Sequence, residues 1–184
     1  MYQKTFSNDR VFVHAHFGTN DIDDIFAKLR YLIVGCDCKW VVVDHLHMLV
    51  SAMSEGDERR SIDNIMTRLR SMVEETGAGI ILVSHLRRVD GNKGHENGII
   101  VSLSHLRGSN SIAQLSDCVI ALERNQQAED ELEARTTKLR VLKSRYTGDV
   151  GMSTSLVYDK ETGRLSEYED DELMFDEDNL ELPL

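Results

Sequence analysis

The sequence is poor in cysteine, has no long apolar run, and carries fewer basic than acidic residues (21 Lys and Arg against 32 Asp and Glu). Three cysteines in a chain of this size do not form a disulfide framework, and they favour a reducing compartment, the cytoplasm. No apolar run approaches the roughly 20 residues needed to span a bilayer, and the first ten residues lack the apolar segment of a secretory signal peptide. These absences exclude secreted, membrane and collagen-like proteins, but they name no function.

The chain does have the length and composition of one folded domain: 184 residues, of which 41% are apolar and 29% charged. Its net charge of -11 is concentrated at one end, because nine acidic residues and no basic residue follow Ser166. Residues 1–166 therefore carry only -2, and such a body can still bind a polyanion through a local basic cluster. We expect a folded portion over 1–165 and an acidic disordered tail over 166–184.

The tail combines its acids with apolar side chains, namely Leu173, Met174, Phe175, Leu180 and Leu182. This composition is typical of a disordered segment that docks on a basic partner protein. Nucleic acid would repel it. A tail that only solvates the protein is the alternative interpretation.

Apolar periodicity predicts an α/β fold with a mostly parallel sheet flanked by helices. Two continuous apolar strands, 39–44 and 79–85, are separated by an amphipathic helix over 57–76, which is typical of parallel strands covered on both faces. Closely spaced strands later in the chain predict an added antiparallel edge. The remaining expected elements are a strand over 10–17, a helix over 21–34 capped by Asn20, a loop over 87–104, a helix over 109–116, strands over 117–123, 138–146 and 154–158, and a turn over 159–163.

Polar residues follow both apolar strands, and the carboxyl ends of parallel strands share one rim of the sheet. Asp44, His45, Ser84 and His85 should therefore lie near one another. Trp40–Asp44 has the form of a Walker B strand, which holds a carboxylate where it can orient Mg²⁺ beside nucleotide phosphates. His85 could hydrogen-bond a γ-phosphate or an attacking water. There are alternatives, however. Many α/β strands end in Asp without binding Mg²⁺, and a histidine at the rim of a sheet can have no functional role.

Basic residues gather just after the second apolar strand. Arg87, Arg88, Lys93 and Arg107 lie in or beside a glycine-rich segment, which suits a phosphate backbone because charge matters there more than sequence. A solvated charged loop is the alternative.

A second basic pair lies near a glycine turn. The spacing places Lys143 and Arg145 on one face of a strand, from which they could reach a neighbouring subunit's nucleotide and stabilise transition-state charge. Two exposed bases on an edge strand are the alternative interpretation.

A zinc site could be drawn from Cys36-x-Cys38, His14-x-His16 and His45-x-His47. The C-x-C spacing is tighter than in usual structural zinc sites, and the last histidine pair follows the Walker-like strand. Cys118 is more simply a small core residue. We therefore expect no structural zinc site.

The order of the motifs points to a family. VVVDH, ILVSHLRR, SLSHLRGSNSIAQLSDCVIALERNQQ, LRVLKSRYTGDVG and a YDKETG turn before an acidic tail occur in sequence. This order closely resembles the C-terminal half of the primase–helicases of short-tailed lytic phages, within the DnaB-like, RecA-fold family of hexameric replicative helicases. The similarity runs from about Asp21 to Leu165. It implies an NTP-dependent DNA helicase in the host-cell cytoplasm that translocates on single-stranded DNA and unwinds duplex.

The resemblance also implies roles at the nucleotide, which would be ATP or dTTP with Mg²⁺. Asp44 matches the Walker B aspartate and His85 the phosphate sensor. Arg145 matches the arginine finger supplied to the next subunit of the ring, with Lys143 beside it. Two further positions approach the nucleotide or the subunit interface: Arg124 and Tyr158, whose ring would pack on the base.

The resemblance places DNA contacts in two loops. One runs from Arg87 to Lys93, and the other is Leu106-Arg107-Gly108-Ser109. Asn110 and Ala113 depart from the family pattern, which puts a glycine and a basic residue there. The acidic tail resembles a segment that docks on the replicative DNA polymerase.

The sequence contains no G-x-x-x-x-G-K-[ST] P-loop, and only 43 residues precede Asp44. The family's P-loop and catalytic glutamate lie upstream of the Walker B strand, so we expect a domain incomplete at its N-terminus and an isolated chain without activity. A split gene product or a truncation would explain this. We also expect uncovered apolar strands and dependence on a partner. The alternatives are a non-catalytic adaptor for the polymerase, a subunit that completes another chain's ATPase site, and, less well matched by LRGS and SRYTGD, a RecA-type recombinase.

Overall fold

The computed structural model describes residues 11–14, 21–51, 57–88, 94–108 and 110–168. The chain divides into two compact units, which are described separately. The first combines Met1–Arg88 with Ser102–Asp117, and the second combines Val89–Val101 with Cys118–Leu184.

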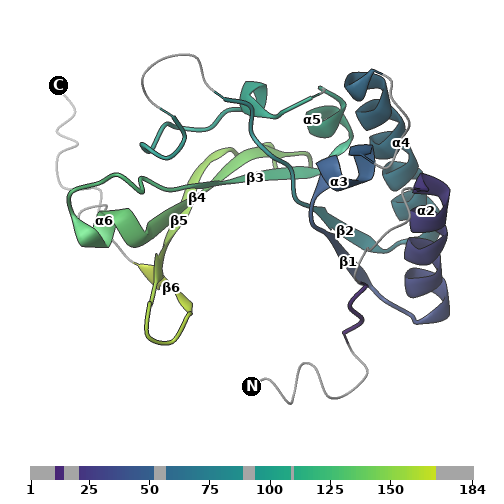
Figure 1. Ribbon diagram of the computed structural model, residues 1–184, viewed down its shortest axis with the longest axis horizontal. Helices are drawn as coiled ribbons and strands as arrows, with labels where there is room; N and C mark the ends of the chain where they lie inside the picture. The colour runs from purple at the N-terminus through teal and green to yellow at the C-terminus, as the bar shows by residue number, and fades with distance from the viewer. Residues whose placement is uncertain (1–10, 15–20, 52–56, 89–93, 109, 169–184) are drawn as a thin grey trace, which may run out of the picture. The chain divides into compact units, whose positions relative to one another are not determined.

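The first unit is built on a parallel strand pair covered by helices (Figure 1). Strands β1 and β2 pair in parallel from Trp40↔Gly79 to Val43↔Leu82. The elements are α2 (Ile22–Arg30), the π-helical turn η1 (Tyr31–Gly35), β1 (Trp40–Val43), α3 (Leu46–Ser51), α4 (Glu58–Thr76), β2 (Gly79–Leu82), the 3-10 turn η2 (Leu103–His105) and α5 (Ser111–Leu115).

Local sequence fixes the ends of the two long helices. The Asp21 carboxylate caps α2 by accepting the Asp23 N–H, so the cap is Asp21 and not Asn20 as expected. Asp57 caps α4 in the same way. Gly77 ends α4 in the left-handed conformation (φ 70°), which glycine adopts without strain.

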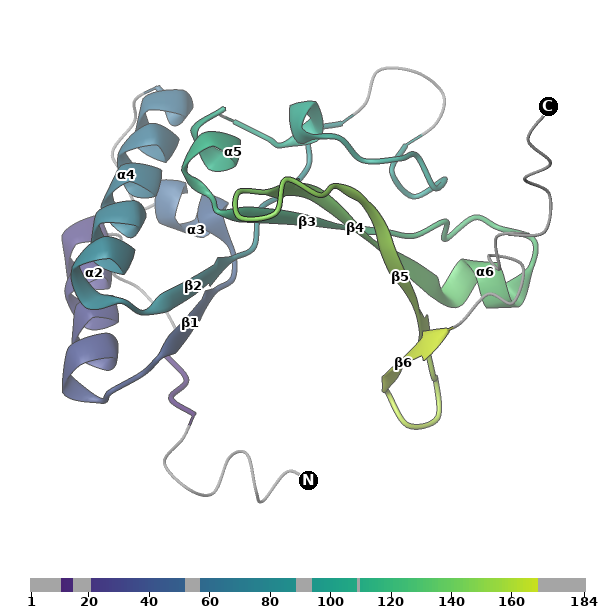
Figure 2. The same ribbon diagram turned by 180° about the vertical axis from the view of Figure 1, so that it is seen from behind.

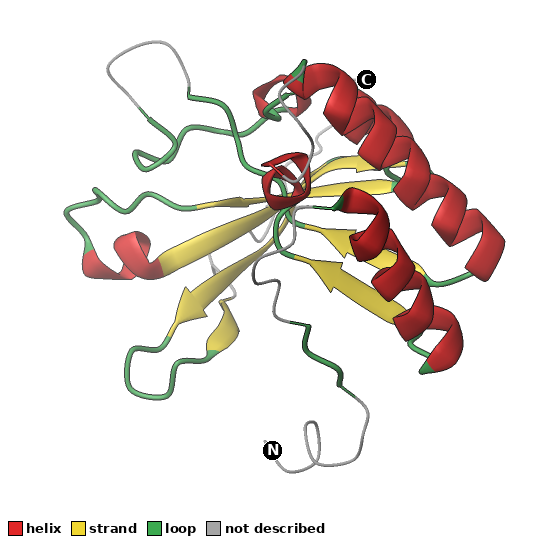
Figure 3. Ribbon diagram, turned by 45° about the vertical axis from the view of Figure 1, so that its right-hand side comes forward, coloured by secondary structure: helices red, strands yellow, loops and turns green. Residues whose placement is uncertain are grey.

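Helices α2 and α4 lie along one face of the β1–β2 pair (Figure 3). Val41 and Val43 of β1 face them and are buried, whereas Trp40 and Val42 are 70% and 64% exposed. Coverage of both faces was expected; within the described part of this unit only one face is covered, because its helices pack on the same side. The buried core consists of Ile25, Phe26, Ile33, Val41, Val43, Leu46, Leu49, Ile62, Ile65, Met66, Leu69, Met72, Ala78 and Ile112.

The second unit is an antiparallel sheet with strand order β3-β4-β5-β6 (Figure 2). Asp159 shapes the turn between β5 and β6, where its carboxylate accepts N–H groups of Glu161 and Thr162. The elements are β3 (Cys118–Glu123), α6 (Glu131–Arg135), β4 (Thr136–Ser144), β5 (Gly151–Tyr158) and β6 (Leu165–Tyr168).

The expected α/β class, with parallel strands first and antiparallel strands later, is confirmed. Residues 11–14 carry no strand, and the rest of the strand expected at 10–17 lies outside the described residues. Strand β6 takes in the first residues of the segment expected as a tail, while 169–184 are also outside. Among the described helices, none combines the length and hydropathy needed to cross a bilayer.

Substituting Ile65 tests the core of the first unit. Ile65 is fully buried in α4, so Ile65→Ala should lower the free energy of unfolding by about 3 kcal/mol through lost transfer energy and the remaining cavity. Ile81→Ala is a matched control, because Ile81 is 50% exposed, and it should cost about 1 kcal/mol or less. Urea unfolding measures both. Equal losses would contradict the assignment of this core.

Candidate functional site

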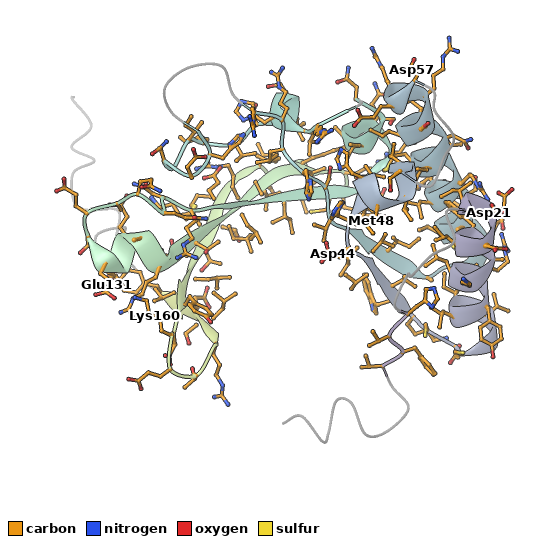
Figure 4. All side chains as sticks on the ribbon, viewed as in Figure 1. Asp21, Asp44, Met48, Asp57, Glu131 and Lys160 are labelled. Atoms are coloured by element: carbon orange, nitrogen blue, oxygen red, sulfur yellow. The ribbon has the colours of Figure 1, made fainter. Side chains whose placement is uncertain are left out.

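The carboxyl ends of β1 and β2 form one rim in the first unit. The Val83 N–H donates to the Val43 carbonyl (3.0 Å), and the Leu46 N–H donates to the Val83 carbonyl (2.9 Å). These bonds bring Asp44 and His45 beside the segment that follows β2, as the sequence predicted. Figure 4 places Asp44 at the end of β1, next to the short helix α3.

Asp44 offers the carboxylate that a nucleotide-bound Mg²⁺ requires. Its side chain is exposed, and the described residues provide it with no hydrogen bond or ion pair. Mg²⁺ is usually held by one or two carboxylates together with phosphate and water oxygens. The residue at this rim therefore fits the ion, with the remaining ligands supplied by nucleotide and water.

Three histidines meet at the same rim. The ring centroids of His45 and His85 are 4.1 Å apart, and those of His47 and His85 are 5.3 Å apart with nearly parallel planes (18°). His45 precedes α3, His47 lies in its first turn and His85 follows β2. Sequence reasoning placed His45 and His85 at this rim, and it weighed His47 only as part of a zinc site that it did not expect. The His45-x-His47 spacing after one strand and a histidine after the next was the signal that could have predicted the cluster.

The surroundings of His47 favour its neutral form. Burial is the largest cause that lowers its pKa from the ordinary 6.5, followed by the positive charges of Arg107 and of His85 when protonated. The Glu58 carboxylate, 3.9 Å from Nε2 of His47, acts in the opposite direction but does not outweigh them. The His47 side chain is only 10% exposed, which explains why desolvation dominates.

This lowered pKa predicts acid sensitivity. As pH falls through 6.5 the unfolded chain protonates His47 before the folded chain does, so folding stability decreases. The His47→Gln variant lacks this decrease in stability. Between about pH 7.5 and about pH 5.5 the melting temperature of the variant should therefore fall less than that of the parent. Thermal denaturation monitored by circular dichroism measures the difference, and His14→Gln, at an exposed position, is the control. Identical pH profiles in parent and His47→Gln would reject the assignment.

The two basic segments of the first unit lie side by side. Leu86 and Leu106 form an antiparallel bridge, the Arg87 N–H donates to the His105 carbonyl (2.8 Å), and the Arg107 N–H donates to the His85 carbonyl (3.1 Å). In this register Arg87 lies opposite His105 and Arg107 lies opposite His85, so the two basic segments run antiparallel beside each other.

Individual positions of these segments differ in their surroundings. Arg88 is exposed, and the Arg107 guanidinium lies 3.4 Å from the Glu58 carboxylate. Gly108 has φ 109°, and a Cβ there would lie 2.1 Å from Cδ1 of buried Ile62, so glycine is required. Lys93 and Ser109 lie outside the described residues.

The other expected nucleotide contacts belong to the second unit. Strand β4 ends at Ser144, so Arg145 lies in the following turn and not on a strand face beside Lys143 as expected. The glycine turn explains this, because the Gly148 N–H closes back onto the Ser144 carbonyl (3.0 Å). Tyr158 is the last residue of β5 and is 39% exposed. Their placement relative to Asp44 and His85 stays a prediction.

Glu123 is a buried acid in the second unit that sequence reasoning missed. It is 6% exposed, and its Oε1 accepts both the Val101 N–H and the Arg140 Nε–H at 2.8 Å. Arg124 beside it donates from Nε to the Ala134 carbonyl (2.7 Å). Both line a cavity of about 360 Å³. An acid at the end of an apolar strand carries no signal of burial in the sequence, since its basic partner lies on another strand.

Comparison with known proteins gives consistent matches. Residues 2–167 match the family model described as the DnaB-like helicase C terminal domain. A DNA helicase/primase of Enterobacteria phage T3 is 40% identical over 164 residues, which are 89% of this chain and 28% of that protein.

Two solved structures share the fold. One is an ATPase domain (TM-score 0.64, 25% identity, covering 81% of this chain and 52% of that one). The other is a DnaB-like replicative helicase described with its interactions with primase (TM-score 0.65, 23% identity, covering 85% of this chain and 36% of that one). The RecA-like ATPase fold implied by the motif order is thereby confirmed, and the chain spans less than a third of its phage relative.

Proposed function

Because the chain belongs to the DnaB-like helicase C-terminal domain family, we propose that it is part of a replicative DNA helicase. Hydrolysis of ATP or dTTP would drive translocation on single-stranded DNA and the unwinding of duplex. One observation supports this above all: the carbonyl of His85 accepts the N–H of Arg107, so the expected phosphate sensor is bonded directly to an expected DNA-contacting loop.

In this proposal Asp44 and His85, two residues at the rim, have different roles. Asp44 holds Mg²⁺, which neutralises phosphate charge when the nucleotide is bound. His85 hydrogen-bonds the γ-phosphate, and its position changes when that group is lost. The change passes through the backbone bond to Arg107, so the basic segments contact DNA differently in each nucleotide state.

DNA is held by charge more than by sequence. Arg87, Arg88 and Arg107 would contact backbone phosphates, together with Lys93, Gly108 and Ser109. Opening of the Arg107–Glu58 ion pair would free one guanidinium for DNA. Because the pair is half exposed, this costs little.

The second unit supplies groups to a neighbouring subunit in a ring, which we propose to be a hexamer of identical chains. Arg145 acts as the arginine finger with Lys143 near it, while Arg124 and Tyr158 approach the nucleotide. The acidic segment over 166–184 docks on the replicative DNA polymerase. Without a P-loop in its own sequence, the isolated chain hydrolyses no nucleotide.

A second candidate function is a non-catalytic one: an adaptor that binds the polymerase, or a subunit that completes the ATPase site of another chain. The missing G-x-x-x-x-G-K-[ST] motif favours it. It predicts that the purified chain binds polymerase, or a P-loop-bearing polypeptide, without itself supporting a helicase.

A chimera tests the proposed function. In it, this chain replaces the 164 matched residues of the phage T3 helicase/primase, and we expect the rest of that protein to supply the P-loop that the family resemblance places upstream of Asp44. We expect hydrolysis of dTTP or ATP that single-stranded DNA stimulates, together with strand separation, because the grafted rim and basic segments complete the motor. Steady-state hydrolysis and a fluorescent unwinding substrate measure this.

The matched control is the same chimera with Asp44→Asn, which keeps the shape of the side chain and loses the charge for Mg²⁺. It should assemble and yet be inactive. A parent chimera that folds and forms rings but hydrolyses no faster than Asp44→Asn would contradict the proposal and favour the adaptor.

A further inference from the structure

The three rim histidines form a cluster with the donor atoms of a metal site. One nitrogen from each of His45, His47 and His85 lies within 4.8 Å of the others. The residues come from two chain segments, the β1–α3 junction and the segment after β2, and backbone bonds hold these segments together. The cluster is therefore built by the fold and not by one flexible loop.

Three ring nitrogens of this cluster are buried without a hydrogen bond to any described residue. Nδ1 of His45 and both ring nitrogens of His47 are buried, and they have no hydrogen-bond partner among the described residues. Buried polar atoms are nearly always paired, so unpaired imidazole nitrogens that converge with a third imidazole point to a ligand.

We propose that His45, His47 and His85 bind a transition-metal dication of the Zn²⁺ class. Three imidazoles with an open fourth position form a common zinc donor set, with tetrahedral geometry and Zn–N distances of about 2.0–2.1 Å. Two nitrogens bound tetrahedrally to one zinc ion at that distance lie about 3.3–3.4 Å apart, so rotation of the rings has to close the present spread of up to 4.8 Å. Glu58 lies 3.9 Å from Nε2 of His47, where a carboxylate orients a ring that binds metal through Nδ1.

This site differs from the magnesium site at Asp44. Mg²⁺ prefers oxygen ligands, whereas imidazole nitrogen selects Zn²⁺, Ni²⁺, Co²⁺ and Cu²⁺. The cysteines are separate as well, because Cys36 and Cys38 precede β1 and the histidines lie beyond its other end. The Arg107 charge weakens cation binding, and the Glu58 charge, paired with it at 3.4 Å, offsets that effect.

One consequence rests on the proposed function. A metal-bound His85 keeps only one ring nitrogen for a γ-phosphate and its ring is held in place by the metal, so metal occupancy would interfere with nucleotide sensing. Metal binding by the chain itself does not depend on that function and is tested without nucleotide.

The experiment titrates the full chain with Zn²⁺ by calorimetry and with Co²⁺ by visible absorption. We expect one equivalent to bind, with the strong visible bands of tetrahedral cobalt and without the near-ultraviolet charge-transfer bands of thiolate ligands. His45→Gln and His47→Gln should each weaken binding at least about tenfold, since even loss of a group that supports a ligand costs that much. His14→Gln, at an exposed position outside the cluster, should bind as the parent does.

A second measurement needs no variant. The chain has seven histidines, and one equivalent of Zn²⁺ should shift the imidazole C2 proton resonances of three of them. Absence of binding, thiolate bands in the cobalt spectrum, or unchanged affinity in His45→Gln and His47→Gln would overturn the proposal. A chain that binds no metal would not change the interpretation of the chimera. An inactive chimera, in turn, would not change the interpretation of the metal titration.

Discussion

Replacing Arg145 with alanine in the T3 chimera is expected to lower the rate of nucleotide hydrolysis by about 10³-fold or more while leaving nucleotide binding intact. An arginine supplied in trans stabilises charge that develops only in the transition state, so its loss affects kcat and not ground-state affinity. Arg145 is exposed in the turn after β4, as a residue that acts on a neighbouring subunit must be. Hydrolysis kinetics together with fluorescent-nucleotide binding separate the two effects.

Two controls make this result specific. Arg164→Ala removes another exposed arginine, between β5 and β6, and should leave the rate unchanged. Mixed rings of Arg145→Ala and Asp44→Asn subunits should recover part of the activity, because some interfaces then pair an intact finger with an intact Asp44. If Arg145→Ala alone retains the full rate, the finger assignment is wrong.

Glu123→Ala is expected to lower the free energy of unfolding by about 3–5 kcal/mol. The substitution leaves the Arg140 guanidinium, whose side chain is 22% exposed, without its carboxylate, and it leaves the buried Val101 N–H without an acceptor. Chemical denaturation measures the loss. Glu161→Ala makes the same change on an exposed turn and should have little effect.

A double substitution distinguishes an unpaired charge from lost packing. Glu123→Leu combined with Arg140→Leu removes both charges and fills the space, so it should be clearly more stable than Glu123→Leu alone. If the double variant is no more stable than the single one, desolvation of an unpaired Arg140 is not the cause. In that case the Val101 contact carries the effect.

Much of the local structure followed from local sequence. The helix over Glu58–Thr76 was predicted to within a residue at its start, because Asp57 caps it and Gly77 ends it. The apolar strands around Val41 and Ile80 were predicted because buried parallel strands are continuously apolar. Asp44 and His85 were expected at one rim because parallel strands end on the same side of a sheet.

Other features depend on contacts that the linear pattern does not encode. Arg145 was expected on a strand, but the turn closed by Gly148 and Ser144 ends β4 before it. Helix α6 and the short strand β6 (Leu165–Tyr168) form in segments whose apolar periodicity is weak. The contacts of these segments join positions far apart in the chain. An example is the ion pair between Glu131, in α6, and Lys160.

The sequence alone determined the class of the fold, the order of its motifs and the carboxylate and imidazole at the strand ends, since these depend on short-range periodicity and on the geometry common to parallel strands. Only the tertiary structure decided that His47 joins His45 and His85, that the His85 carbonyl bonds Arg107, and that Glu123 is buried against Arg140. Each of these contacts joins separate segments, and which partners meet depends on how strands and helices pack, a property of the whole core that no short stretch of sequence contains.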